Sequence, residues 1–191
     1  MADNSKPRFG LRTSAIGRRS EVWLQKHNPL DIVTLSSEVA ADVAPLAVDA
    51  GYELALDAPD SPVMVMGDAQ SLSRVLTNLI QNAITHGGGC GVITVNVHMD
   101  GTFGVSDQGP GIPENERDRI FEPFYRLHPS SEGAGLGLHL VQEIVALHGG
   151  RIEVVEAEGG GAWFRVQLLT VVPRVEVPGA QPSQSYGLGQ A

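Results

Sequence analysis

One predicted helix carries polar side chains at a regular spacing. The helix begins after Asp68, and Asn78, Asn82 and Thr85 recur on it at i, i+4 and i+7. They therefore share one face beside the apolar stripe. A carboxamide oxygen can ligate a hard cation such as Mg²⁺, which takes few protein ligands when phosphates supply the others. Solvated surface amides explain the same pattern, so the spacing alone leaves both interpretations open.

A glycine-rich turn follows a predicted strand at residues 107–113 (DQGPGIP). Gly109 and Gly111 allow the backbone to turn sharply and to approach a ligand without side-chain obstruction. The Asp107 carboxylate at the strand end can accept a hydrogen bond from an exocyclic amine. A D-x-G-x-G pattern is weak on its own, and an ordinary turn is the alternative.

A second glycine cluster opens the last predicted helix, at residues 132–138 (EGAGLGL). Glycines at a helix N-terminus present backbone amides and the positive end of the helix dipole, an arrangement that binds phosphate. A polar loop precedes them, which excludes the Rossmann fingerprint, and the chain has no Gly-Lys-Ser/Thr step of a Walker A loop. Close helix packing also favours glycine.

An aromatic run, residues 120–127 (IFEPFYRL), lies between the two glycine clusters and precedes a short polar run. Aromatic side chains at the base of a mobile loop would make that loop a lid over a ligand. A satellite core cluster explains the aromatic side chains equally well, but it does not explain Arg126 beside them.

The charge distribution restricts how an anion is bound. The chain has 191 residues and a formal net charge of −9, which argues against duplex nucleic acid as the main partner. Six of its 13 basic side chains lie in residues 1–29, and no lysine follows Lys26. An anion bound to the rest of the chain must be neutralised by a metal ion, arginine or backbone amides.

Composition also limits the class of protein. No run reaches the roughly 18 apolar residues that a membrane span needs, and the basic N-terminus lacks the apolar stretch of a secretory signal. The single cysteine, Cys90, excludes an internal disulfide and a cysteine-cluster zinc site. These features predict a reducing, cytoplasmic setting.

The hydrophobic pattern predicts an α+β fold: a two-layer α/β sandwich with a mixed, mostly antiparallel sheet. Predicted strands are grouped in hairpins with helices between the groups, which favours this architecture. The predicted helices span residues 29–50, 68–86 and 136–147, and the predicted strands span residues 52–57, 63–66, 92–98, 102–107, 151–156 and 162–169.

Composition divides the chain into three parts. Residues 1–28 are expected to be a flexible basic arm or the remnant of an upstream element. Residues 29–172 are expected to form one compact domain. Residues 173–191, rich in proline, glycine, serine and glutamine, are expected to be a disordered tail.

Four motifs in this order resemble the N, G1, F and G2 boxes of sensor histidine kinases. They are residues 78–83 (NLIQNA), 107–112 (DQGPGI), 120–124 (IFEPF) and 133–138 (GAGLGL). About residues 30–170 are similar to the catalytic and ATP-binding domain of these kinases, which belongs to the GHKL superfamily and has the Bergerat fold. The resemblance implies binding of Mg-ATP and donation of the γ-phosphoryl group to a histidine.

The resemblance also implies a role for each matched residue. Asn82 would ligate Mg²⁺, Asn78 would lie in the phosphate or metal shell, and Asp107 would bind the adenine amino group. Arg126 would reach the phosphates from the lid and, with Asn78, take part in catalysis. The other residues implied to contact the nucleotide are His86, Gly109, Gly111, Ile112, Phe124, Gly133, Gly135, Leu136, Gly137 and Leu138.

The chain departs from the family pattern at two places. Thr85 stands where the family usually has a lysine or arginine, so Mg²⁺, amides, Arg126 and His86 must neutralise the phosphates. The phosphoacceptor box is absent, because His27 is followed by Asn-Pro-Leu. The acceptor histidine is therefore expected on a dimerisation domain outside this chain. The resemblance further implies a monomeric fragment of a homodimeric parent, which is cytoplasmic or anchored in the inner membrane, and a response regulator downstream.

Two other functions fit the same motifs: an anti-sigma-type serine kinase and a nucleotide-binding module without catalysis. The superfamily members that hydrolyse ATP or phosphorylate serine use a glutamate base four residues before the metal-binding asparagine. This chain has Asn78 there, which cannot accept a proton. A histidine nitrogen needs little help from a base, so the histidine kinase is favoured and negligible free ATPase activity is predicted.

Overall fold

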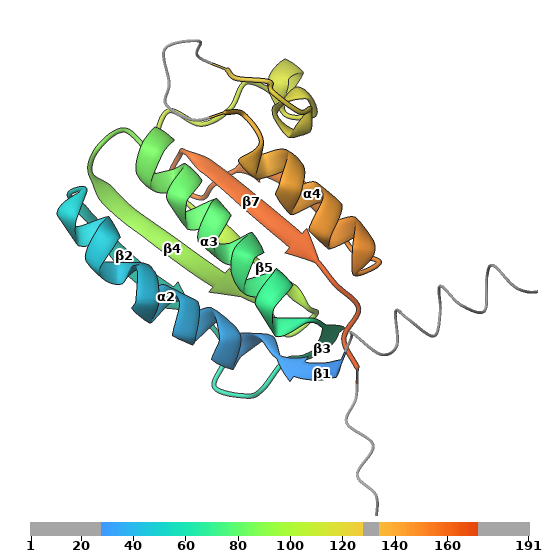
Figure 1. Cartoon of the computed structure of the whole chain (residues 1–191). Helices are drawn as coiled ribbons and strands as arrows, with labels where there is room; N and C mark the ends of the chain where they lie inside the picture. Colours follow the sequence, from blue (N-terminus) through green and yellow to red (C-terminus); the bar gives the residue numbers. More distant parts are fainter. Residues whose placement is uncertain (1–27, 128–133, 172–191) are drawn as a thin grey trace, which may run out of the picture.

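The computed structural model describes residues 28–127 and 134–171, which form a helical layer and a sheet layer (Figure 1). The elements, in chain order, are β1 (Asn28–Asp31), α2 (Ile32–Asp49), β2 (Tyr52–Asp57), β3 (Met64–Gly67), α3 (Ala69–His86), β4 (Gly91–Val97), β5 (Thr102–Ser106), the 3₁₀ helices η1 (Glu114–Glu116) and η2 (Arg119–Phe121), α4 (Gly137–Leu147), β6 (Arg151–Glu156) and β7 (Ala162–Gln167). The predicted α+β class is confirmed.

The main sheet has five strands in the order β2-β4-β5-β7-β6. The β2–β4 pair is parallel and the other pairs are antiparallel, as the prediction of a mixed, mostly antiparallel sheet requires. The strand predicted at residues 63–66 does not join this sheet, because β3 pairs with β1 instead. Strand β1 was not predicted, because three of its four residues were assigned to the start of the helix predicted at residues 29–50.

Helix α2 begins at Ile32, three residues after the predicted start, because Asp31 is its N-cap. The Asp31 carboxylate accepts the backbone N–H groups of Val33 (3.1 Å) and Thr34 (3.3 Å). It also accepts the N–H of Val63 at 2.9 Å, which joins the helix start to the chain leading into β3. A capping carboxylate satisfies helix donors that would otherwise lack partners.

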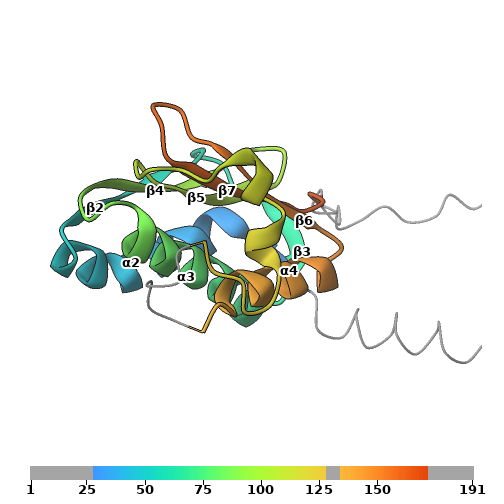
Figure 2. The same cartoon turned by 90° about the horizontal axis from the view of Figure 1, so that it is seen from above.

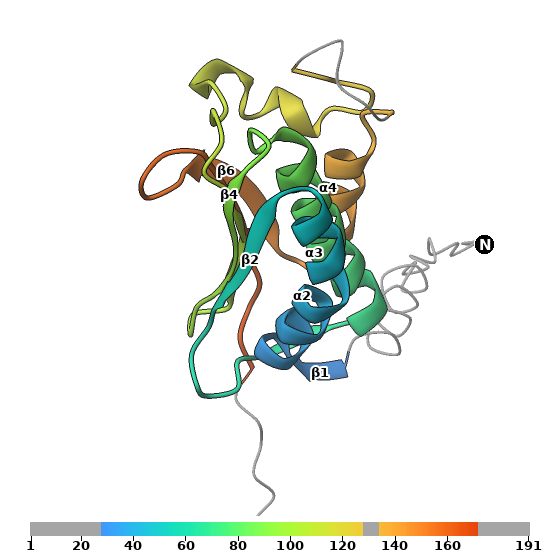
Figure 3. The ribbon, with the colours of Figure 1, turned by 90° about the vertical axis from the view of Figure 1, so that its left-hand side faces the viewer.

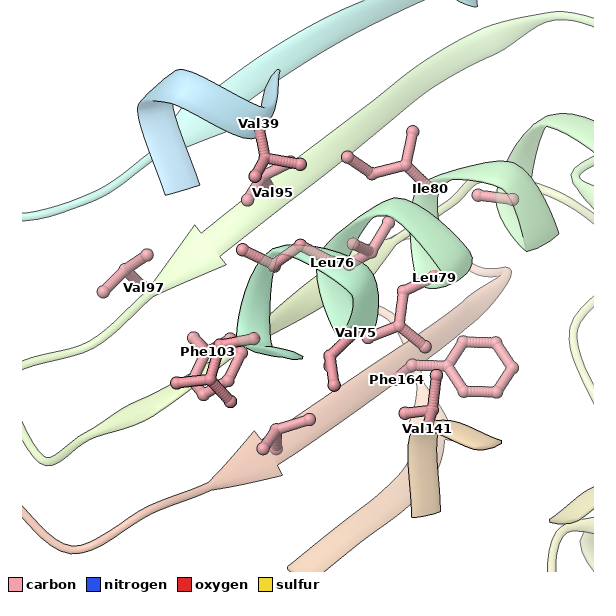
Figure 4. Close-up of a cluster of buried hydrophobic side chains, with 14 of the residues drawn as sticks. Val39, Val75, Leu76, Leu79, Ile80, Val95, Val97, Phe103, Val141 and Phe164 are labelled. Carbon is pink, nitrogen blue, oxygen red and sulfur yellow. The ribbon is translucent and has the colours of Figure 1, made fainter. Parts of the chain in front are cut away.

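The helices α2, α3 and α4 cover one face of the main sheet (Figures 2 and 3). Alternate residues of β4 are buried against them, and the apolar stripe of α3 is buried between α2 and α4. Figure 4 shows this core, to which α3, α4, β4, β5 and β7 all contribute side chains. Within the described ranges, each helix is too short or too polar to cross a membrane.

The buried imidazole of His148 connects the end of α4 to the start of α3. Its Nδ1 lies 2.7 Å from the carbonyl oxygen of Ile144, and its Nε2 lies 3.1 Å from the backbone nitrogen of Asp68. The Asp68 N–H is a donor, so Nε2 is the acceptor and Nδ1 carries the proton. This side chain therefore joins the C-terminal end of α4 to the N-terminal end of α3.

Replacement of this histidine is the test of that connection. We expect His148→Ala to lower the free energy of unfolding by about 1–3 kcal/mol, because the Asp68 N–H and the Ile144 carbonyl oxygen lose the imidazole as a partner. Urea denaturation followed by circular dichroism measures the change. His98→Ala, at an exposed position, is the control and should cost less than about 1 kcal/mol. Equal losses in the two variants would contradict the assignment.

Candidate functional site

A pocket of about 400 Å³ opens between α3, the turn after β5 and the start of α4. The residues predicted from separate motifs, up to 60 positions apart in the sequence, meet around it. Its lining residues are Asn78, Gln81, Asn82, Thr85, His86, Asp107, Pro110, Gly111, Ile112, Ile120, Tyr125, Arg126, Leu127, Ala134, Gly135, Leu136, Gly137, Leu138, Ala162 and Phe164. A pocket with an apolar lining and a few polar groups is typical of a small-molecule site.

The α3 wall presents the amide side chains. The Asn78 Nδ2 donates to the carbonyl oxygen of Arg74 at 2.7 Å. This bond turns the Asn78 Oδ1 toward α4, where it lies 3.3 Å from the place that a Cβ on Gly137 would occupy. The Thr85 hydroxyl donates to the carbonyl oxygen of Gln81 at 2.8 Å, so it is already engaged with its own helix.

The Asp107 carboxylate lies at the closed end of the pocket and is 7% exposed. Its Oδ1 accepts the backbone N–H of Gly109 at 2.9 Å and that of Ala162 at 3.3 Å. Within the described residues, both of the carboxylate's hydrogen bonds use this one oxygen. Oδ2 therefore keeps its acceptor capacity for a ligand with an N–H group.

Close backbone approaches hold this carboxylate in place. A Cβ on Gly109 would lie 2.7 Å from the Cα of Gly87, in the loop after α3, and 3.0 Å from the Asp107 Oδ1. Gly111 has φ of 72°, a conformation that favours glycine. A Cβ on Gly161 would lie 2.0 Å from the Asp107 carbonyl oxygen, so the β6–β7 turn closes directly on the strand end.

The start of α4 forms the opposite wall. Its N-cap is Leu136, and no side chain of the described residues caps it. The first N–H groups of an uncapped helix have no partner within the helix. Gly135, with φ of 68°, accepts the N–H of Phe124 at 2.9 Å through its carbonyl oxygen, which joins this wall to the aromatic run.

Eleven of the predicted site residues line the pocket, but Gly109 and Phe124 do not. Gly109 lies behind Asp107, against the loop after α3. The Phe124 side chain is 71% exposed, and its residue has φ of 65°. The glycine predicted at position 133, with the polar run predicted to form a lid, lies outside the described residues. The roles of these residues stay predictions.

Sequence reasoning missed the β7 side of the pocket. Ala162 and Phe164 alternate into the core side of β7, and both line the pocket. Their alternation was visible, and it predicted the strand. The missing information was the sheet order, because only the pairing of β7 with β5 brings Ala162 beside Asp107.

Few charged side chains surround this pocket. Its basic lining residues are His86 and Arg126, and its acidic one is Asp107. In the part of the chain that the structure describes, no three His, Cys, Asp or Glu side chains gather to hold a metal ion. A cation here would therefore need oxygen ligands from another source in addition to the amides.

Residues 67–171 match the family described as histidine kinase-, DNA gyrase B- and HSP90-like ATPases. This match covers more than half of the chain. The chain belongs to this ATPase family. Membership explains why the two glycine clusters, the amide helix and the carboxylate turn occur together around one pocket, since this is an ATP-binding domain.

Known sensor kinases are similar to this domain. The histidine-protein kinase/phosphatase MprB of Mycolicibacterium smegmatis is 37% identical over 91% of this chain and 39% of its own length. The structure of a mycobacterial sensor histidine kinase MprB has a TM-score of 0.64 and 30% identity, over 75% of this chain and 97% of that one. Full-length ShkA in complex with AMPPNP has a TM-score of 0.64 and 32% identity, over 76% of this chain and 32% of that one.

The chain spans less than half of the length of the curated relatives it matches, 39% in the case of MprB. The family assignment therefore applies to the ATP-binding domain. The activity and partners of a whole kinase are proposals for this chain.

The low positive charge of the pocket predicts the effect of an added lysine. Thr85→Lys is expected to tighten ATP binding about three- to tenfold, because an ammonium group would face bound phosphates. Isothermal titration calorimetry at two salt concentrations measures it, and the gain should shrink at high salt. Gln70→Lys places the same charge at an exposed position on α3 and should change the affinity little. Equal gains in both variants would indicate a long-range effect of net charge.

Proposed function

We propose that this chain is the ATP-binding catalytic domain of a two-component sensor histidine kinase. It binds Mg-ATP in the pocket between α3 and α4 and presents the γ-phosphoryl group to a histidine of a dimerisation domain. The observation that supports this most strongly is that an acceptor carboxylate, the amide side chains of Asn78 and Asn82 and an uncapped helix start line one pocket. The ATP analogue named in the ShkA complex supports the same ligand class.

The closed end of the pocket suits adenine. The Asp107 Oδ2 would accept the exocyclic amine, while apolar side chains of Ile112, Ile120 and Phe164 would face the ring. Guanine has a carbonyl oxygen in place of that amine and would meet the carboxylate as a second acceptor. The site therefore favours ATP over GTP.

The open end suits the phosphates. The N–H groups at the start of α4 would donate to the phosphate oxygens, helped by the helix dipole. Asn82 would ligate Mg²⁺ with its amide oxygen, and Asn78 would hold a phosphate or metal-bound water. The cation fits this site because the phosphates would supply the oxygen ligands that are not provided by a cluster of acidic side chains among the described residues. Bound there, it would neutralise charge on the phosphates.

Transfer would depend on positioning and charge neutralisation, since the neutral histidine nitrogen is already a nucleophile. Arg126 would hold the transferred phosphoryl group, and Asn78 would orient it. Neither group removes a proton. We infer from this that the domain hydrolyses ATP slowly when no acceptor is present.

The proposed function also implies the other parts of a parent kinase. The acceptor histidine lies on a dimerisation domain, the parent is a cytoplasmic or membrane-anchored homodimer, and a response regulator takes the phosphoryl group. Residues 29–172 are proposed as the domain, and the family match to residues 67–171 supports most of that range.

A phosphotransfer assay tests this function. The protein is incubated with γ-labelled ATP, Mg²⁺ and a separately produced dimerisation domain from a relative. Acid-labile label on that domain's histidine supports the kinase. ATP binding without transfer supports a non-catalytic module, and label on serine supports the anti-sigma type. Arg126→Ala should slow transfer at least about tenfold and change adenosine affinity less than about twofold.

The adenine contact has its own test. Asp107→Asn keeps an oxygen for the N–H groups of Gly109 and Ala162 but places a donor toward the base amine. We expect ATP affinity to fall at least about tenfold and the preference for ATP over GTP to disappear. Competition binding measures both values. Asp100→Asn, at another carboxylate that accepts a turn N–H, should leave them unchanged; an unchanged preference in Asp107→Asn would refute the contact.

A further inference from the structure

Three side chains between the two glycine clusters form a closed set of contacts. The Tyr125 hydroxyl donates to the Glu116 Oε2. The Arg119 Nη1 lies 3.3 Å from both carboxylate oxygens of Glu116. The Arg119 guanidinium also lies over the Tyr125 ring, 4.6 Å from its centroid. Each side chain thus contacts the other two.

The contacts of this cluster connect two walls of the pocket. Glu116 belongs to η1, which follows the glycine turn after β5, and Arg117 beside it donates through Nε to the carbonyl oxygen of Ile112 at 3.2 Å. Ile112 and Tyr125 both line the pocket. The Glu116–Tyr125 hydrogen bond therefore joins the wall at the Asp107 turn to the wall that carries Arg126.

The residues next to Tyr125 are fixed from the other side as well. The Phe124 N–H donates to Gly135, just before α4, and the Tyr125 N–H donates to the carbonyl oxygen of Glu122 at 3.2 Å. A Cβ on Gly135 would lie 2.9 Å from the Tyr125 carbonyl oxygen. Arg126, the next residue, thus extends from a backbone held at two points. Figure 1 shows this segment, in yellow, at the end of the molecule where α4 begins.

The two charged members of the cluster lie outside the central core, against which the Tyr125 ring packs. The Arg119 side chain is 52% exposed and that of Glu116 is 16% exposed. Both lie outside the buried hydrophobic cluster, although Ile120 and Phe121 between them and Tyr125 belong to it. A tyrosine hydroxyl is protonated at neutral pH, and the hydrogen bond to Glu116 raises the pKa of Tyr125 further. We therefore expect the cluster to affect the wall of the pocket that carries Tyr125.

On this basis, and resting on the proposed function, we propose that Glu116 and Arg119 are positioning residues for the phosphates. They hold the Tyr125 ring at the pocket wall and thereby the neighbouring Arg126 in the direction of the phosphate end. A wall fixed before binding loses less conformational freedom when the nucleotide enters. The hydrogen bonds that hold the Asp107 carboxylate, at the proposed adenine end, come from Gly109 and Ala162 and not from the cluster.

Calorimetric titration of the chain with Mg-ATP and with adenosine tests this. Tyr125→Phe keeps the ring and removes only the donor, and Glu116→Ala removes the acceptor. Each variant should weaken Mg-ATP binding about five- to twentyfold and change adenosine affinity less than about twofold. The double variant should be no weaker than the poorer single variant, because both changes break one contact. Glu116→Gln keeps an acceptor for the hydroxyl and should restore part of the ATP affinity.

Glu114→Gln, at an exposed position on the same 3₁₀ helix, is the matched control and should bind like the parent chain. If Glu116 and Tyr125 had a purely structural role, their variants would have a lower melting temperature. They would then bind Mg-ATP and adenosine equally more weakly, or bind both unchanged. Unchanged ATP affinity in Tyr125→Phe and Glu116→Ala, or equal loss of ATP and adenosine, overturns the proposal. If the parent chain itself fails to bind Mg-ATP, the proposed function fails instead.

Discussion

The Asp107 carboxylate, at the end of β5, is almost fully buried and uses one oxygen for two backbone N–H groups. Burial of a carboxylate is costly unless hydrogen bonds stabilise the charged form. Those two bonds come from Gly109, in the following turn, and from Ala162, at the start of β7. The same contacts that make the buried charge acceptable therefore join the turn to the sheet and leave the second oxygen for a ligand. The pocket is built around this arrangement.

The position of the Asp107 carboxylate requires backbone segments to approach one another closely. The turn can lie against the loop after α3 only because Gly109 has no side chain, and the β6–β7 turn can close on Asp107 only because Gly161 has none. At the other wall, Gly135 allows the aromatic run to reach the start of α4. His148 fixes the opposite ends of α3 and α4. Small residues and one buried imidazole thus determine the shape of the space between the helices.

The chemistry of this space follows from its sparse charge. With His86 and Arg126 as the basic lining residues, a triphosphate must be stabilised largely by backbone amides and by a cation that it carries with it. The direction of the Arg126 side chain is therefore important for binding a triphosphate. The Glu116–Arg119–Tyr125 cluster lies directly before that residue, and its contacts connect the wall at the Asp107 turn to the wall that carries Arg126.

The sequence by itself determined most of the elements and the types of side chain at the candidate site. The apolar stripe of α3 and the paired hairpins are local patterns of period 3.6 and 2, and they predicted the helix at residues 68–86 and the α+β class. The motif order predicted eleven residues that line the pocket. Only the tertiary structure decided which strands pair and which residues from different elements lie side by side. The β1–β3 pair, the place of Ala162 next to Asp107 and the bond from Tyr125 to Glu116 depend on strand order and on long-range or irregular backbone paths. Such contacts leave no periodic pattern in a sequence, because they are set by packing between elements and not within them.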